Sequence, residues 1–397
     1  LVIDGFEDFT LNSTGTNSSS TVVSNVIDDI AGLSTDTKLT ISGDKALTAT
    51  GIESTFTTIT VTNTAGADLT VDAGGALKFT GGTGDDRLAL ATIADITSAD
   101  VLKGGDGVNT FAITSATELE NADFTATQIA AISNFQTIEF TGAQDLTATD
   151  TNVARSFDLT KFTGVNKLII GGALTTDAAD TLTIVANNNF TLALGGAVVA
   201  TTNYVDVQIA NSSAAGTNDT VTLALNKESG GASLAIAGVT IDNVENLNIQ
   251  VKGVQATNDI ITVSDIDGAQ LQRITLSSTA GNNSDGTAKA AESLTITTVE
   301  TTLLSTFDAS AYTGVLTITG LSTKYTATGA TVIGGAGDDN ITGGVGDEVG
   351  VAASRVATRC DIRTRGRRGG SVDDNWVSSC LRARISRNVL SCRTKGM

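Results

Sequence analysis

The sequence predicts an all-β protein, folded as a right-handed parallel β-roll or β-solenoid with glycine-rich turns. Apolar and polar residues alternate with a period of two in short segments such as 58–62, 205–209 and 294–296. Glycine, asparagine, aspartate and serine separate these segments, and proline is absent. Two nine-residue stretches, 81–89 and 334–342, share the pattern G-G-x-G-x-D-x-U-x, in which U is a large aliphatic residue. This pattern is typical of stacked parallel coils.

These patterns predict the secondary-structure elements along the chain. Nearly all are expected to be short strands, and one short helix is expected within 115–132. Residues 157–165 are echoed by 307–315, and residues 132–140 by 241–249. The resulting segments are 1–80, a β-rich solenoid segment; 81–113, degenerate repeats; 114–330, a threonine-rich β-solenoid with internal echoes; 331–350, further repeats; and 351–397, a basic tail.

Each echoed Phe-Asp element contains one aspartate, Asp158 or Asp308. These residues could serve as metal ligands or catalytic acids. We expect them instead to be turn residues whose side chains bond their own backbone.

The composition excludes several classes of function. The chain of 397 residues has a net charge of −19, which argues against nucleic acid and anionic membrane surfaces as partners. No stretch approaches the roughly 18 apolar residues of a membrane helix, so membrane insertion is not expected. Histidine is absent, which excludes H-E-x-x-H zinc proteases and nucleophiles activated by histidine. We therefore expect a protein that is not an enzyme.

The last 47 residues differ from the rest. Eleven of the 24 basic residues and three of the 43 acidic ones lie in 351–397, so residues 1–350 carry a net charge of −27. The change begins inside a repeat, where Asp347 is in register and Glu348 is not. The tail could be a basic arm for nucleic acid or lipopolysaccharide. The interpretation that we favour is a frameshifted or misjoined sequence, which would be disordered.

The nonapeptides carry residues suited to calcium. Calcium prefers six to eight oxygen ligands from carboxylates and carbonyls, and glycine permits the turn that aims carbonyls inward. One turn supplies only part of this shell, so stacked turns should share an ion. Degenerate copies begin at Gly104, with asparagine at the aspartate position, and at Gly343. The candidate Ca²⁺ ligands are Gly81, Gly82, Gly84, Asp85, Asp86, Gly104, Gly105, Asp106, Gly107, Asn109, Gly334, Gly335, Gly337, Asp338, Asp339, Gly343, Gly344, Gly346, Asp347 and Glu348. The alternative is a Gly-Asp turn without metal.

Taken together, the strand motifs, the Phe-Asp elements and the nonapeptides resemble the C-terminal part of RTX-type calcium-binding surface-layer (S-layer) proteins of Gram-negative bacteria. The likeness covers most of residues 30–348, including 39–82 and 307–339. It implies type I secretion, calcium-dependent folding outside the cell and assembly into a two-dimensional lattice. The tail 351–397 departs from the family's C-terminal secretion signal.

The expected function is therefore that of a calcium-dependent structural protein of a bacterial surface layer, located at the cell surface. Its partners would be other copies of the chain, joined through calcium, and in addition cell-surface polysaccharide or lipopolysaccharide. An RTX adhesin or carbohydrate-binding surface module is the alternative, because the same repeats occur in such proteins. A β-helix uronate lyase or epimerase is a third interpretation.

Overall fold

The fold is taken from a computed structural model of the 397-residue chain. The residues that it describes are 1–3, 6–15, 24–32, 37–72, 74–116, 118–119, 124–145, 155–175, 182–195, 198–199, 204–209, 218–225, 234–252, 260–279, 293–301, 303–321, 331–337, 339–342 and 351–352. The chain divides into two compact units, Leu1–Gly196 and Ala197–Met397.

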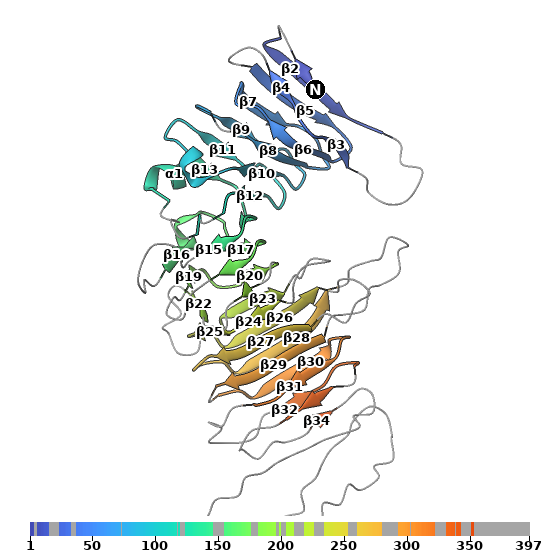
Figure 1. The fold of residues 1–397 in the computed structure, drawn as a ribbon, viewed down its shortest axis with the longest axis vertical. Helices are drawn as coiled ribbons and strands as arrows, with labels where there is room; N and C mark the ends of the chain where they lie inside the picture. The colour runs from blue at the N-terminus through green and yellow to red at the C-terminus, as the bar shows by residue number, and fades with distance from the viewer. Residues whose placement is uncertain are drawn as a thin grey trace, which may run out of the picture. The chain divides into compact units, whose positions relative to one another are not determined.

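The first unit consists of parallel sheets whose strands alternate along the chain (Figure 1). One sheet has the order β13-β11-β9-β7-β5-β2, and its strands are Ile132–Ser133, Val101–Lys103, Lys78–Thr80, Phe56–Val61, Thr37–Gly43 and Asp8–Ser13. The second runs β3-β6-β8-β10-β12-β14-β17-β20, formed by Asn25–Ile27, Leu47–Ile52, Ala67–Val71, Arg87–Leu90, Thr110–Ile113, Thr137–Phe140, Lys167–Ile170 and Phe190–Leu194. Successive strands from β5 to β14 therefore belong to the two sheets in turn.

Smaller pairings complete this unit. They join β1 to β4 (Val2–Ile3 and Ala31–Gly32), β15 to β18 (Gln144–Asp145 and Leu174–Thr175), and β16 to β19 (Arg155–Asp158 and Leu182–Ala186). The 3₁₀ helices η1 and η2 span Ile93–Asp95 and Leu159–Lys161. The helix α1, Ala126–Ala131, confirms the short helix expected in this region. The side chain of Thr125 accepts a hydrogen bond from the Gln128 amide and so caps its first turn.

The second unit is likewise built from parallel sheets. One sheet runs β23-β26-β28-β30-β32-β34, formed by Thr220–Leu225, Asn246–Lys252, Arg273–Thr279, Thr306–Ala311, Thr331–Ile333 and Val351–Ala352. The other contains β21, β24, β27, β25 and β22, formed by Val198–Val199, Ala235–Ile236, Ile260–Asp267, Gly238–Asp242 and Tyr204–Ile209. From β27 it continues through β29, β31 and β33, formed by Ser293–Glu300, Leu316–Ile318 and Asn340–Ile341. Residues 353–397 of the tail lie outside the described part of the chain.

The pairing register of the strands places the apolar side chains of neighbouring strands next to one another in continuous rows. In the first unit Leu39 lies opposite Ile59, which lies opposite Phe79, and all three are at most 1% exposed. Phe135 packs against Phe79 and Phe111, with ring centroids 6.4 and 5.7 Å away. Alternate residues of each strand thus fill a core between the sheets, which is what period-two patterning predicts. The described residues confirm the all-β class with parallel sheets.

The side chains of both echoed aspartates bond nearby backbone amides, as expected, but only Asp158 lies at a turn, as the cap of η2, whereas Asp308 lies within strand β30. The Oδ1 atom of Asp158 accepts a hydrogen bond from the Thr160 amide at 3.0 Å. The Oδ1 atom of Asp308 accepts one from the Ser310 amide, also at 3.0 Å. Each side chain therefore stabilises the backbone two residues further along the chain.

Candidate metal-binding turns

The first nonapeptide forms the turn between β9 and β10, where residues 81–86 cross from one sheet to the other. The Gly81 amide donates a hydrogen bond to the Lys103 carbonyl, which belongs to the next repeat. A Cβ atom on Gly81 would lie 1.8 Å from the carbonyl oxygen of Gly104. A Cβ atom on Gly84 would lie 2.2 Å from the amide nitrogen of Gly66. The glycines are required because the backbones of stacked turns touch.

Asp86, the sixth residue of this nonapeptide, is only 1% exposed. Its Oδ2 atom accepts a hydrogen bond from the Gly82 amide at 2.6 Å, and its Oδ1 atom accepts one from the Ala67 amide at 2.8 Å. Burial raises the pKa of Asp86 above 3.8, with a smaller contribution from the charge of Asp85, while the two amides act in the opposite direction. A charged carboxylate at this position is therefore costly to bury, and a bound cation would stabilise it.

The second nonapeptide repeats this arrangement between β32 and β33. The Oδ2 atom of Asp339 accepts a hydrogen bond from the Gly335 amide at 2.6 Å. Its Oδ1 atom accepts one from the Leu316 amide, which belongs to the preceding strand of the sheet, at 3.0 Å. A Cβ atom on Gly337 would lie 2.2 Å from the carbonyl oxygen of Gly314. Two distant copies of the same pattern therefore give their sixth-position aspartate the same kind of contacts.

The degenerate copy at 104–109 forms the turn between β11 and β12, next to the first nonapeptide. Asn109 is fully buried, and its Oδ1 atom accepts a hydrogen bond from the Asp86 amide at 2.8 Å. Its Nδ2 atom donates to the carbonyl oxygens of Asp106, Gly105 and Asn134 at 3.0, 3.3 and 3.3 Å. An amide group thus lies where the other two copies have a carboxylate.

A feature that sequence reasoning missed links these turns: at several strand entries the side chain of the preceding residue caps the previous repeat. Asp86 accepts from the amide of Ala67, Asn109 accepts from Asp86, and Gln136 accepts from Asn109 at 2.7 Å. The same contact recurs in the second unit, where an Oε2 atom of Glu245 accepts from the Asp219 amide at 2.9 Å. A polar residue immediately before these strands was the available signal. The sixth position of the nonapeptide is therefore a structural cap whether or not a metal binds.

The other predicted ligands differ in where they lie. The Oδ1 atom of exposed Asp85 accepts a hydrogen bond from the Val108 amide at 2.8 Å, so it contacts the neighbouring turn. Asp106 is exposed, and its amide donates to the Gly82 carbonyl at 2.8 Å. The predicted ligands that lie outside the described residues are Asp338, Gly343, Gly344, Gly346, Asp347 and Glu348.

These donors suit calcium better than a transition metal. In the described part of the chain, no three or more acidic, histidine or cysteine side chains gather closely enough to hold a metal ion by themselves. Each aspartate turn instead offers one carboxylate, buried at Asp86 and half-buried at Asp339, among closely packed main-chain groups. Each carboxylate oxygen of Asp86 accepts one amide and retains a further lone pair. Calcium is a hard cation that takes carboxylate oxygens of this kind as ligands.

Arg87, which follows the first aspartate turn, is engaged elsewhere. Its Nε atom lies 2.7 Å from an Oε2 atom of Glu139, and its Nη1 atom lies 2.9 Å from an Oδ1 atom of Asp68. These partners lie on β14 and β8, so the Arg87 guanidinium connects neighbouring parts of one sheet. The described contacts of the Asp86 carboxylate are with backbone amides and do not include this guanidinium.

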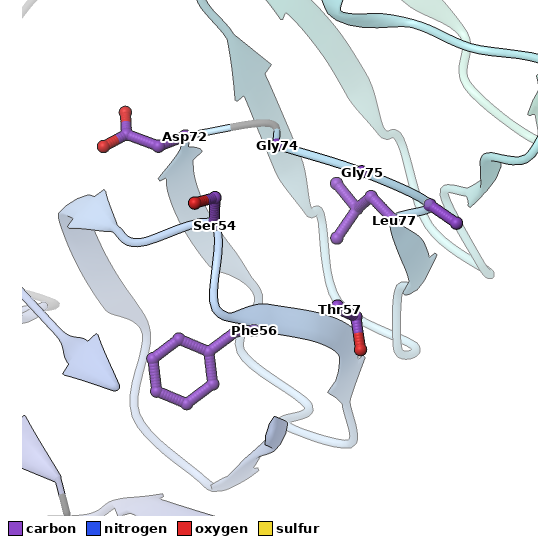
Figure 2. Close-up of a pocket in the computed structure, with 8 residues that line it drawn as sticks. Ser54, Phe56, Thr57, Asp72, Gly74, Gly75 and Leu77 are labelled. Atoms are coloured by element: carbon purple, nitrogen blue, oxygen red, sulfur yellow. The ribbon is translucent and has the colours of Figure 1, made fainter. Parts of the chain in front are cut away.

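Two small pockets lie away from the glycine turns. The first is lined by Ser54, Phe56, Gly74 and Leu77, and the Asp72 side chain points away from Leu77 (Figure 2). The second is lined by phenylalanines including Phe157 and Phe162. Neither brings together a pair of carboxylates, which is what glycoside cleavage uses.

None of the helices in the described ranges is long and apolar enough to cross a membrane. Comparison with known proteins found no family model that matches this chain, and no curated protein sequence that matches it.

Proposed function

We propose that this protein is a calcium-dependent structural protein of a bacterial surface layer, which self-assembles outside the cell. The observation that carries the proposal is the shared geometry of the two full nonapeptides. In both turns the aspartate carboxylate accepts one amide from its own turn and one from the preceding repeat. Two copies that keep glycine and aspartate in the same geometry fit a repeated binding turn.

The proposed architecture is a right-handed parallel β-solenoid. Its support is the alternation of successive strands between two sheets together with parallel pairing in each sheet. In such a fold each repeat buries its apolar face on its neighbours, so the stack needs many repeats to be stable. Turns that meet at one corner then form a line along the stack, and neighbouring turns can share a cation.

Calcium would be held by Asp86 and Asp339, with Asp85 and main-chain carbonyls completing its shell. The ion would offset the cost of burying the Asp86 carboxylate and part of the net charge of −19. Because the unfolded chain lacks this arrangement of oxygens, binding free energy would add to folding free energy. The low calcium level inside cells and the higher level outside would then confine folding to the cell exterior.

The test is a calcium titration of the full chain, followed by circular dichroism, thermal melting and electron microscopy. Calcium should raise the β-signal and the melting temperature and should produce ordered sheets. A spectrum and melting temperature that are the same with calcium and with chelator would contradict the calcium function. A protein that stays monomeric in saturating calcium would favour the adhesin or carbohydrate-binding alternative.

The pH dependence of the stabilisation by calcium provides a second test. The pKa of Asp86 is raised in the fold, so without calcium its contribution to stability is present below pH 3.8 and lost as the pH rises through the raised pKa. Calcium binds the ionised carboxylate, so the stabilisation by calcium should be largest at neutral pH and should fall on acidification. A calcium effect of equal size at pH 4 and pH 7 would argue against Asp86 as a ligand.

A further inference from the structure

The turn 104–109 differs from the first aspartate turn in the direction of its backbone. Gly105 and Gly107 have φ angles of +86° and +90°, a region open mainly to glycine, whereas Gly82 and Gly84 do not have positive φ. In the aspartate turn the Gly82 amide therefore points toward the side chain of the sixth residue. In the turn 104–109 the Gly105 carbonyl points there instead. The side chain at the sixth position therefore meets an N–H donor in the aspartate turn and a carbonyl acceptor in the turn 104–109.

The hydrogen bonds fix the orientation of the Asn109 amide. Its oxygen must face the Asp86 N–H, because only the oxygen can accept that bond. Its nitrogen then faces three carbonyl oxygens, those of Gly105, Asp106 and Asn134. Asn134 lies in the next repeat, so the amide joins two turns. A carboxylate could accept the first bond but could not donate to the carbonyls.

We infer that the amide nitrogen of Asn109 takes the place of a cation, so that the turn 104–109 is folded without calcium while the turns of Asp86 and Asp339 use it. The NH₂ group carries partial positive charge and meets carbonyl oxygens that would otherwise need another donor or an ion. The inference rests on the proposed calcium function. It assigns different metal requirements to adjacent turns that share one glycine pattern.

Asn109→Asp tests the inference because it preserves the size of the side chain and the bond from the Asp86 amide. In chelator the second carboxylate oxygen would face three carbonyl oxygens, and the melting temperature should fall several degrees below that of the native protein. Saturating calcium should restore the melting temperature of Asn109→Asp to that of the native protein. Isothermal titration calorimetry should show one more calcium ion bound per chain than in the native protein. Asn12→Asp, which adds the same charge at an exposed position, should change neither quantity.

Equal melting temperatures of Asn109→Asp and the native protein in chelator would overturn the inference. So would a loss of one bound calcium ion in Asn109→Ala, because the native turn would then be a calcium site. A native protein that binds no calcium at all would refute the proposed function instead, and the chelator comparison would still test the role of the amide.

Hydrogen exchange on the native protein provides a measurement that does not depend on a folded variant. The Asn109 backbone amide, which donates to Gln136 of the next repeat, should be protected to the same extent in chelator and in calcium, whereas the Gly82 amide, which donates to Asp86, should gain protection when calcium is added. Equal gains at both amides would contradict the inference, because the asparagine turn would then depend on the ion as its neighbour does.

Discussion

Gly81 shows how one residue is fixed by its neighbours in space rather than in sequence. Its amide bonds the Lys103 carbonyl, and its α-carbon faces the carbonyl oxygen of Gly104. No side chain fits between the two turns unless the backbone moves. A glycine of the metal-binding pattern is thus also a packing requirement of the parallel stack.

Gly81→Ala should therefore destabilise the protein strongly, by about 3 kcal/mol or more, because the new methyl group would lie 1.8 Å from a backbone oxygen. Thermal melting in chelator measures this effect apart from any calcium binding. Gly75→Ala is the matched control, since a Cβ atom there would meet no atom within 4 Å. If both variants melt at the same temperature, the close contact between the turns is not real.

The entries to β10, β12 and β14 each connect one repeat to the previous one. Main-chain hydrogen bonds hold the strands together along their length. At the strand entry, one side-chain oxygen also accepts a hydrogen bond from the amide at the start of the corresponding strand in the previous repeat. The partners along the chain Ala67, Asp86, Asn109 and Gln136 are 19, 23 and 27 residues apart. The length of a repeat therefore varies while the contact is preserved.

Gln136→Met should remove the acceptor for the Asn109 amide while keeping the side chain close in size. The buried amide would lose its partner, and the free energy of unfolding should fall by about 1–3 kcal/mol. Chemical denaturation in chelator is the measurement. Gln250→Met on β26 is the control, because that half-buried glutamine is not at a strand entry; an equal loss in both variants would show that the effect is general.

On the scale of the whole molecule, charge is the dominant property. Residues 1–350 carry a net charge of −27, and the threonine-rich strands add few cations to balance it. Mutual repulsion of this size opposes a compact fold and is reduced when cations bind. The acidity and the proposed calcium dependence therefore belong together.

The basic tail 351–397 gives a prediction at this same scale. Because the composition changes inside a nine-residue repeat, we expect a shift of the reading frame near the codon of Asp347 to restore Gly-Gly-x-Gly-x-Asp turns and an acidic sequence without cysteine. Resequencing of the DNA is the measurement. A confirmed frame, together with a tail that resists limited proteolysis, would show a genuine basic domain.

The sequence alone determined the features that depend on near neighbours in the chain. Period-two alternation predicted short strands and an all-β fold, because successive side chains of a strand point to opposite faces. The turn role of Asp158 and the short helix Ala126–Ala131 were also predictable, since each rests on contacts within a few residues. The glycine patterns likewise placed turns at 81–86 and 334–339.

Only the tertiary structure decided which groups meet across repeats. The Asn109 amide finds a carbonyl 25 residues away at Asn134, and Arg87 finds Glu139 at a separation of 52 residues. Repeats of unequal length give these partners no fixed spacing that a sequence pattern could show. The physical reason is that parallel strands pair through long connections, so register is set by packing of the whole stack rather than by the turns themselves.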